Sequence, residues 1–257
     1  MKIAELTQDY EMFCPQSLAL FDDPVGLQIG DLNQEVKKVL VTLDIREQVV
    51  DEAIKLGVDL IFAKHPVIFS PLSALTTTNP QEHLVWRLAR ANIAVYTSHT
   101  NIDVVAGGLN DDFASLLDLT EVRALDDENQ MGRIGEVEPI RLSVLTEKVK
   151  AVFGRDRLRV VTYDHTMNQV IRRIAICGGT GGKLWPLAVE KKADLLITGD
   201  IYYHTAHDFL SQGLVAIDPG HYIEHLFIPK IAKLLRTYND KLEVFESQVT
   251  TKPFYDI

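Results

Sequence analysis

The fold is decided by the stretch Val39-Leu40-Val41-Thr42-Leu43 and by Val58-Asp59-Leu60-Ile61-Phe62-Ala63, which follows it. Both runs are rich in β-branched and other apolar residues, as is typical of strands buried on both faces of a sheet. Between them, residues 46–56 carry apolar side chains at helical spacing, and Gly57 stands where a helix cap belongs. A strand, a helix of ~12 residues and a second strand form a βαβ unit, which predicts parallel pairing with a right-handed crossover.

A second copy of this pattern lies in the C-terminal half of the chain. Residues 174–200 again run strand, turn, helix, strand and polar tip. When the two segments are aligned, Ala193-Asp194-Leu195-Leu196 corresponds to Val58-Asp59-Leu60-Ile61, and Asp200 corresponds to His65. The match indicates two similarly built halves that face each other across a cleft.

A domain boundary is expected in a polar, acidic segment near the middle of the chain. Residues 120–135 include Asp126-Asp127-Glu128-Asn129 and interrupt the alternation of strands and helices. We therefore predict an α/β fold with two domains, each a mixed, largely parallel sheet with helices. The first domain is expected to comprise residues 1–122 and 219–257, and the second residues 123–218.

Composition and charge narrow the range of functions and partners that the chain is expected to have. The chain has 257 residues, 46% of them hydrophobic, and a formal net charge of −10. Nucleic acids and anionic membranes attract basic surfaces, so neither is an expected partner. The two cysteines, Cys14 and Cys177, form no CxxC motif, and no apolar run approaches the ~20 residues of a membrane span. With no recognisable leader sequence, we expect a cytoplasmic protein.

Residues that can bind metals gather where the predicted strands end. His65 directly follows the strand at 58–63, and ligands of open α/β sheets lie beyond the carboxyl ends of strands. Further histidine and carboxylate pairs at such junctions are His99 with Asp103, Asp200 with His204, and His221 with Glu224. The alternative for each pair is an ordinary polar helix face, and a lone histidine at a strand tip is more often structural.

The clearest pair stands in Asp218-Pro219-Gly220-His221-Tyr222-Ile223-Glu224. The Pro-Gly turn separates a short apolar strand from an apolar-periodic helix. His221 and Glu224 are three residues apart at the predicted helix start and therefore share one face. Nitrogen and oxygen donors without thiolates suit a divalent transition metal, and Zn, Fe, Mn and Co all remain candidates.

The stretch Gly178-Gly179-Thr180-Gly181-Gly182-Lys183 invites comparison with a nucleotide-binding phosphate loop. Its spacing from glycine to lysine is one residue too short, and Leu184 stands where the motif requires Ser or Thr. We therefore predict a tight structural turn or a weak anion site.

Several short motifs are distributed over nearly the whole chain. They are Gly26-Leu27-Gln28-Ile29-Gly30, Lys64-His65-Pro66-Val67-Ile68-Phe69, Thr97-Ser98-His99-Thr100-Asn101-Ile102-Asp103, Gly107-Gly108-Leu109-Asn110-Asp111, Thr198-Gly199-Asp200 and Gly220-His221-Tyr222-Ile223-Glu224. In this order the sequence resembles the NIF3-like family, many of whose members carry the label GTP cyclohydrolase 1 type 2 homolog. The resemblance implies a dinuclear metal centre between two α/β domains and a ring-shaped homohexamer, here in the short form without an inserted domain.

Carried over residue by residue, the resemblance makes His65, Asp103, His221 and Glu224 the metal ligands. One position departs from the family pattern, because Lys64 stands where the first of two adjacent histidines is usual. An ammonium group cannot ligate a metal, so the ligand count drops by one. The chain is accordingly expected to hold one or two divalent ions.

The chemistry best suited to such a centre is hydrolysis. We expect a metal-dependent hydrolase acting on a small phosphorylated or nucleotide-like molecule, with the cyclohydrolase label inherited from the family. His99 and His204 are candidates to move a proton, and Asp200 to fix an imidazole tautomer. The alternative is a non-catalytic metal carrier, insertion factor or regulatory metal-binding hexamer.

Overall fold

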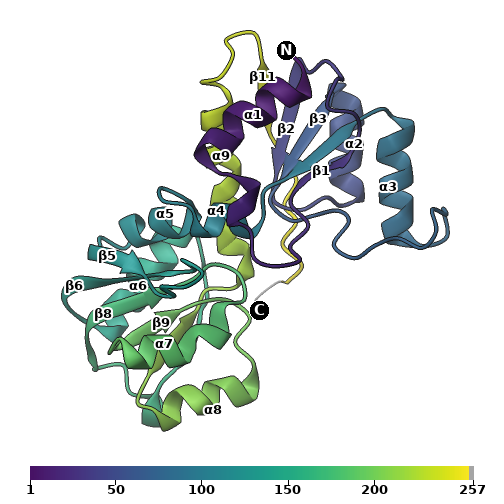
Figure 1. Ribbon diagram of the computed structural model, residues 1–257. Coiled ribbons are helices and arrows are strands. Elements are labelled where there is room, and N and C mark those ends of the chain that lie inside the picture. The colour runs from purple at the N-terminus through teal and green to yellow at the C-terminus, as the bar shows by residue number, and fades with distance from the viewer. Residues whose placement is uncertain (255–257) are drawn as a thin grey trace. The chain divides into compact units, whose positions relative to one another are not determined.

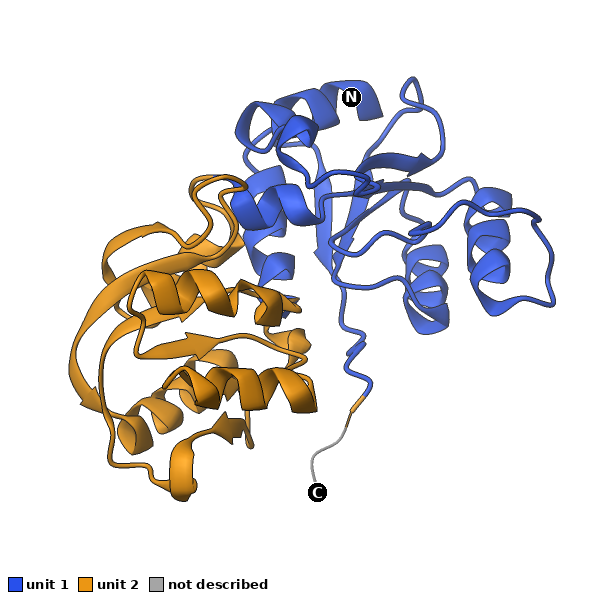
Figure 2. Cartoon of the chain, turned by 60° about the horizontal axis from the view of Figure 1, so that its bottom comes forward, with its two compact units in different colours: residues 1–105, 225–253 blue, residues 106–224, 254–257 orange. Residues whose placement is uncertain are grey.

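The computed structural model describes residues 1–254 and contains two compact units (Figure 1). Unit 1 comprises Met1–Val105 and His225–Pro253, and unit 2 contains Ala106–Glu224 (Figure 2). Each unit is built on its own mixed sheet with helices, so the predicted α/β fold class is confirmed. Unit 1 ends at residue 105, where the sequence suggested 122, because helix α5 (Leu109–Leu116) packs on strands of unit 2.

Unit 1 contains a five-stranded sheet in the order β1-β4-β3-β2-β11. Its strands are β1 (Gly26–Ile29), β2 (Lys38–Thr42), β3 (Leu60–Ala63), β4 (Ala94–Thr97) and β11 (Glu243–Glu246). Strands β4, β3, β2 and β11 are parallel, and β1 pairs antiparallel with β4. The predicted parallel βαβ unit is therefore present as β2, helix α2 and β3.

The helices of unit 1 lie on both faces of this sheet, α1 and α9 on one and α2 and α3 on the other (Figure 1). They are α1 (Ile3–Phe13), α2 (Glu47–Leu56), α3 (Pro80–Arg90), α4 (Thr100–Val104) and α9 (Phe227–Leu235), with a 3₁₀ turn at Gln16–Leu18. Gly57 ends α2 in the left-handed conformation at φ 63°, as predicted. Side chains of α2 and α3, including Val49, Val50 and Leu88, pack against Leu40 and Ile61 of the sheet.

Unit 2 contains a six-stranded sheet in the order β5-β6-β8-β9-β10-β7. Its strands are β5 (Thr120–Ala124), β6 (Arg133–Arg141), β7 (Arg159–Val161), β8 (Val170–Ile176), β9 (Leu195–Ile197) and β10 (Val215–Asp218). Only β8, β9 and β10 pair in parallel, because helical crossovers join them, whereas the outer strands pair antiparallel.

The helices of unit 2 connect these strands. Its α-helices are α5, α6 (Leu142–Phe153), α7 (Trp185–Glu190) and α8 (Tyr203–Ser211), and its 3₁₀ segments are Tyr163–His165, Gly181–Leu184 and His221–Leu226. The segment after the Pro-Gly turn is thus a 3₁₀ helix that leads into α9, whereas the sequence suggested one continuous helix. Pro229 explains the late start of α9, because a proline lacks the N–H that a helix interior requires and is tolerated in a first turn.

No helix in the described part of the chain is both long and apolar enough to cross a membrane. The cores of the two units are made of aliphatic and aromatic side chains that are fully buried, such as Phe62 in unit 1 and Phe209 in unit 2. Burial of this kind is the main stabilising contribution to each sheet and fixes the strand ends described below.

Candidate metal centre

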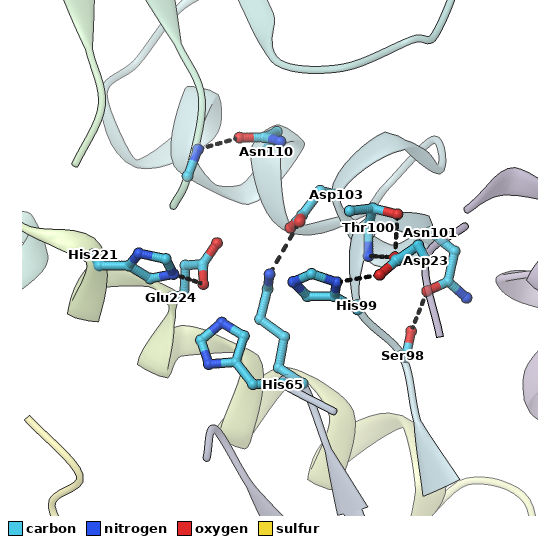
Figure 3. A network of polar contacts seen from close by, with 12 residues as sticks. Asp23, His65, Ser98, His99, Thr100, Asn101, Asp103, Asn110, His221 and Glu224 are labelled. Atoms are coloured by element: carbon cyan, nitrogen blue, oxygen red, sulfur yellow. Dashed lines mark hydrogen bonds and ion pairs between the residues drawn. The ribbon is translucent and has the colours of Figure 1, made fainter. Parts of the chain in front are cut away.

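In unit 1, the candidate residues lie at the carboxyl ends of neighbouring parallel strands. Lys64 and His65 directly follow β3, and His99 follows β4 and precedes the short helix α4, which carries Asp103. Parallel pairing of β3 with β4 places both ends at one edge of the sheet. The rings of His65 and His99 consequently lie side by side, with centroids 5.6 Å apart (Figure 3).

His65 is oriented by a carboxylate from the loop after β2. Its Nδ1 lies 2.7 Å from Oδ1 of Asp44. Burial is the largest single influence and opposes ionisation of Asp44, but the hydrogen bonds from His65 and Thr251 together with the nearby positive charge hold the pKa of the Asp44 carboxyl below its usual range. An ionised carboxylate can only accept, so Nδ1 donates and Nε2 is the nitrogen whose lone pair can bind a metal. Thr251 donates a second hydrogen bond to Asp44 and fixes the other oxygen.

His99 has the same arrangement. Its Nδ1 donates to Oδ1 of Asp23 over 2.6 Å, and the backbone N–H of Thr100 donates to the other oxygen over 3.0 Å (Figure 3). Burial is the largest single influence and acts against ionisation of Asp23, but the hydrogen bonds from His99 and from Thr100 together lower the pKa of Asp23. His99 is thus held in the tautomer that exposes Nε2 to the strand edge.

Lys64 lies at the same edge of the sheet, directly after β3. Its side chain is 1% exposed, and Nζ donates to Oδ2 of Asp103 over 3.0 Å. Asp103, predicted as a metal ligand, therefore binds an ammonium group within unit 1. Lys64 stands where the resemblance led us to expect a histidine, and its charge pairs with Asp103.

In unit 2, His221 and Glu224 lie in the 3₁₀ helix after β10. Nδ1 of His221 donates to Oδ2 of Asp200 over 2.7 Å, and Nε2 lies 3.1 Å from Oε2 of Glu224 (Figure 3). The hydrogen bond to the buried Glu224 raises the pKa of His221 to about 9, although burial opposes the charge. One nitrogen and one oxygen at this separation can be bound by a single cation.

Asp200 accepts the hydrogen bond from Nδ1 of His221 and so sets the tautomer of this imidazole. Burial acts against its ionisation, but the bonds from His221 and Thr180 keep the pKa of Asp200 below its usual range. The proposed role of His204 in proton transfer stays a prediction. This residue lies in α8, where its ring packs edge-on against Tyr203.

The glycine-rich turn of unit 2 makes room for Glu224. A Cβ added to Gly178 would lie 3.2 Å from Oε1 of Glu224, and one added to Gly179 would lie 2.9 Å from the same atom. Gly179 also has a φ of 60°. The N–H of Gly178 is bound by Asn110 over 2.9 Å (Figure 3). The stretch that resembled a phosphate loop is therefore a tight structural turn beside a candidate metal ligand.

Asp44 and Asp23 are functional residues that the sequence reasoning missed. Asp44 precedes His65 by 21 residues, and Asp200 precedes His221 by the same 21 residues. Both pairs span a strand-helix-strand unit, with the aspartate after the first strand and the histidine after the second. In the alignment of the two halves, Asp200 therefore corresponds to Asp44 and His221 to His65, whereas the sequence comparison had aligned Asp200 with His65. The equal spacing of the two Asp–His pairs was the signal available in the sequence.

The donor set fits a divalent transition metal. Imidazole nitrogens whose other nitrogen is held by a carboxylate are the usual histidine ligands of zinc and its neighbours. Glu224 adds a buried carboxylate at 1% exposure, which is paired with His221 in this structure. The two cysteines are buried in the cores, so thiolate ligation plays no part in this set.

Comparison with known proteins places this geometry in a family. The family model described as Duf34/NIF3 (NGG1p interacting factor 3) matches residues 1–253. A Lactococcus lactis protein named GTP cyclohydrolase 1 type 2 homolog is 65% identical over 257 residues, covering 100% of both chains. A protein of the same name from Streptococcus pneumoniae is 46% identical and also covers 100% of both.

A solved structure has the same fold. The crystal structure of a Bacillus cereus protein related to NIF3 matches with a TM-score of 0.94 and 27% identity, covering 100% of this chain and 99% of that one. The order of motifs, the fold and these relatives agree, and the chain belongs to the Duf34/NIF3 family.

Proposed function

We propose that this protein is a metal-dependent hydrolase in which His65, His221 and Glu224 bind a divalent transition ion. Among residues 1–254, these three form the group of histidine and carboxylate side chains that could hold one ion. The observation that carries the proposal is the repeated Asp–His pair, because Asp44 and Asp200 orient the two imidazoles in the way that metal-binding histidines require. The metal-binding role also agrees with the family resemblance.

The residues around the ligands supply the other requirements of hydrolysis. A bound divalent ion would contribute Lewis acidity toward water and toward a carbonyl or phosphoryl oxygen. Asp44 and Asp200 hold the ligand imidazoles in one orientation. His99, with Nδ1 fixed by Asp23, would accept a proton at Nε2 and return it to a leaving group.

A cavity beside His65 favours the proposal that the substrate is a small molecule. Its volume is about 410 Å³, which falls within the range of small-molecule sites. Arg46, Ser70 and Gln81 line it together with His65. Arg46 is exposed at the start of α2, and a guanidinium there suits a phosphate or carboxylate group of a ligand. A phosphorylated or nucleotide-like molecule satisfies both the volume and the charge.

The experiment is a turnover assay of metal-depleted and reloaded protein. Zn, Mn, Fe or Co is added back, and hydrolysis of GTP, other nucleotides and small phosphate esters is followed. We expect activity that depends on the ion and falls by at least 100-fold in His65→Ala and His221→Ala. His83→Ala is the matched control, because His83 lies on α3 and pairs with Glu47 outside the centre.

Two results would count against this function. Hydrolysis that survives complete removal of metal would contradict the proposed chemistry. Stoichiometric metal binding without turnover of any phosphoester, amide or cyclohydrolase substrate would instead identify a metal carrier or a regulatory metal-binding protein.

A further inference from the structure

Unit 1 contains a buried cation at the strand edge where the candidate ligand His65 lies. Lys64 and Asp103 are the two charged residues among those described for unit 1 that are classed as buried. The exposed fractions of their side chains are 1% and 9%, and the distance between Nζ and Oδ2 is 3.0 Å. This is a close, directional ion pair. In the sequence, Lys64 directly precedes His65, and Asp103 follows His99 by four residues.

The presence of a buried ion pair at this position requires an explanation. Two buried charges contribute less to stability than well-packed apolar side chains of similar volume would. The neighbouring positions of β3 are filled by Ile61, Phe62 and Ala63, which are fully buried and apolar, so an aliphatic side chain would fit the pattern at residue 64. A lysine at this edge, where an aliphatic side chain would fit, therefore points to a role for its charge.

The ammonium group and a metal ion compete for the same carboxylate. All the hydrogens of an ammonium donate and no lone pair remains for a metal, so Lys64 cannot be a ligand. A divalent ion bound to the same oxygen of Asp103 would lie next to the ammonium, and two like charges in a buried site repel strongly. Lys64 and a second metal ion therefore exclude each other.

We propose that the Lys64 ammonium replaces the second metal ion of the centre. In this arrangement His65, His221 and Glu224 hold a single divalent ion, and Asp103 binds Lys64 instead of metal. The lysine would supply one positive charge in place of the second ion, and it acts as a positioning residue for Asp103. The inference rests on the proposed metal site and specifies its stoichiometry as one ion per chain.

The test counts metal ions in the wild-type protein and in Lys64→His. Each protein is saturated with Mn²⁺, freed of excess ion by gel filtration and analysed for metal by mass spectrometry. We expect one ion in the wild type and two in Lys64→His, a twofold rise, because the substitution removes the fixed charge and adds an imidazole. Electron paramagnetic resonance is the second readout, with a mononuclear Mn²⁺ spectrum in the wild type and a spin-coupled one in Lys64→His.

Two further variants serve as controls. Lys64→Arg keeps a permanent cation and is expected to hold one ion. Lys55→His adds an imidazole at an exposed position of α2 and is also expected to hold one, which separates a local effect from a general gain of histidine. If Lys64→His does not fold, the spectra and ion counts of the wild type and Lys64→Arg still decide the question.

The outcomes separate this inference from the proposed function. Two ions or a spin-coupled spectrum in the wild type would overturn the inference and leave the hydrolase proposal standing. A single ion in a folded Lys64→His would also overturn it. A wild-type protein that binds no ion would refute the metal centre itself.

Discussion

At the residue scale, each of the candidate ligands His65 and His221 depends on an aspartate in a different loop. Asp44 and His65 come from consecutive parallel strands and meet only because β2 and β3 are paired in register. The carboxylate fixes the tautomer and increases the basicity of the ligand nitrogen. Metal affinity should therefore respond to residues that never touch the metal.

The substitution Asp44→Asn tests this dependence. An amide can accept from Nδ1 but carries no charge, so we expect metal affinity to fall by roughly 10- to 100-fold while the fold is retained. Asp51→Asn is the control, since Asp51 is an exposed aspartate that pairs with Arg87. Isothermal titration with Zn²⁺ measures both, and equal affinities in the two variants would contradict the role of Asp44.

A second residue-scale prediction concerns the buried thiol of Cys14. Burial raises the pKa of Cys14 from 9.0 to about 11, although hydrogen bonds from Tyr10 and Ser98 act in the opposite direction. A raised folded-state pKa means that above about pH 9 the unfolded chain ionises its thiol and the folded chain does not. Stability should therefore decline between about pH 9 and pH 11.

Cys14→Ala isolates this contribution. Between pH 8 and pH 10.5 the wild type should lose about 2 kcal/mol more unfolding free energy than the variant does. Urea unfolding under reducing conditions at the two pH values gives the comparison. An identical pH dependence in both proteins would show that Cys14 ionises as readily when folded as when unfolded.

At the element scale, the strand ends were more predictable than the contacts between them. The βαβ unit at 39–63 followed directly from apolar runs and a capping glycine, because buried parallel strands leave a strong local pattern. The hydrogen-bond and ion-pair partners of the site residues could not be predicted in the same way. These partners are Asp23, Asp44 and Lys64. Their roles depend on strand register and on which loops meet at the sheet edge, and neither property is local in sequence.

The helix start at His221 shows the same limit. Its composition and its i,i+3 pair were evident, but the close packing of its first residues against Gly199, which follows β9, was not. A Cβ on Gly199 would lie 2.7 Å from the backbone nitrogen of His221 and 2.9 Å from the carbonyl carbon of Gly220. The absence of a side chain at Gly199 therefore sets the position of the whole ligand-bearing segment.

Gly199→Ala should displace that segment. We expect metal affinity to fall by roughly tenfold or more, because backbone atoms cannot yield as a flexible side chain would. The control is Gly154→Ala, at the end of α6, where φ is 60° and no atom lies within 4 Å of the added Cβ. It should cost about 1 kcal/mol of stability and leave metal binding intact. Comparable metal affinities in the two variants would contradict the steric argument.

At the scale of the whole molecule, assembly follows from the family resemblance and remains a proposal. We expect a homohexamer with six times the 28.9 kDa mass of one chain. Light scattering coupled to size-exclusion chromatography measures this mass directly, with and without added metal. A monomer or dimer under both conditions would contradict the expectation.

The central claim is that the whole chain assembles a metal centre from His65, His221 and Glu224, and metal content tests it most directly. The wild-type protein, loaded with Zn²⁺ and freed of excess ion, is predicted to retain one ion per chain. His221→Ala should retain almost none, and His83→Ala should match the wild type. A wild-type protein without bound metal, or a His221→Ala variant that retains its ion, would contradict the account.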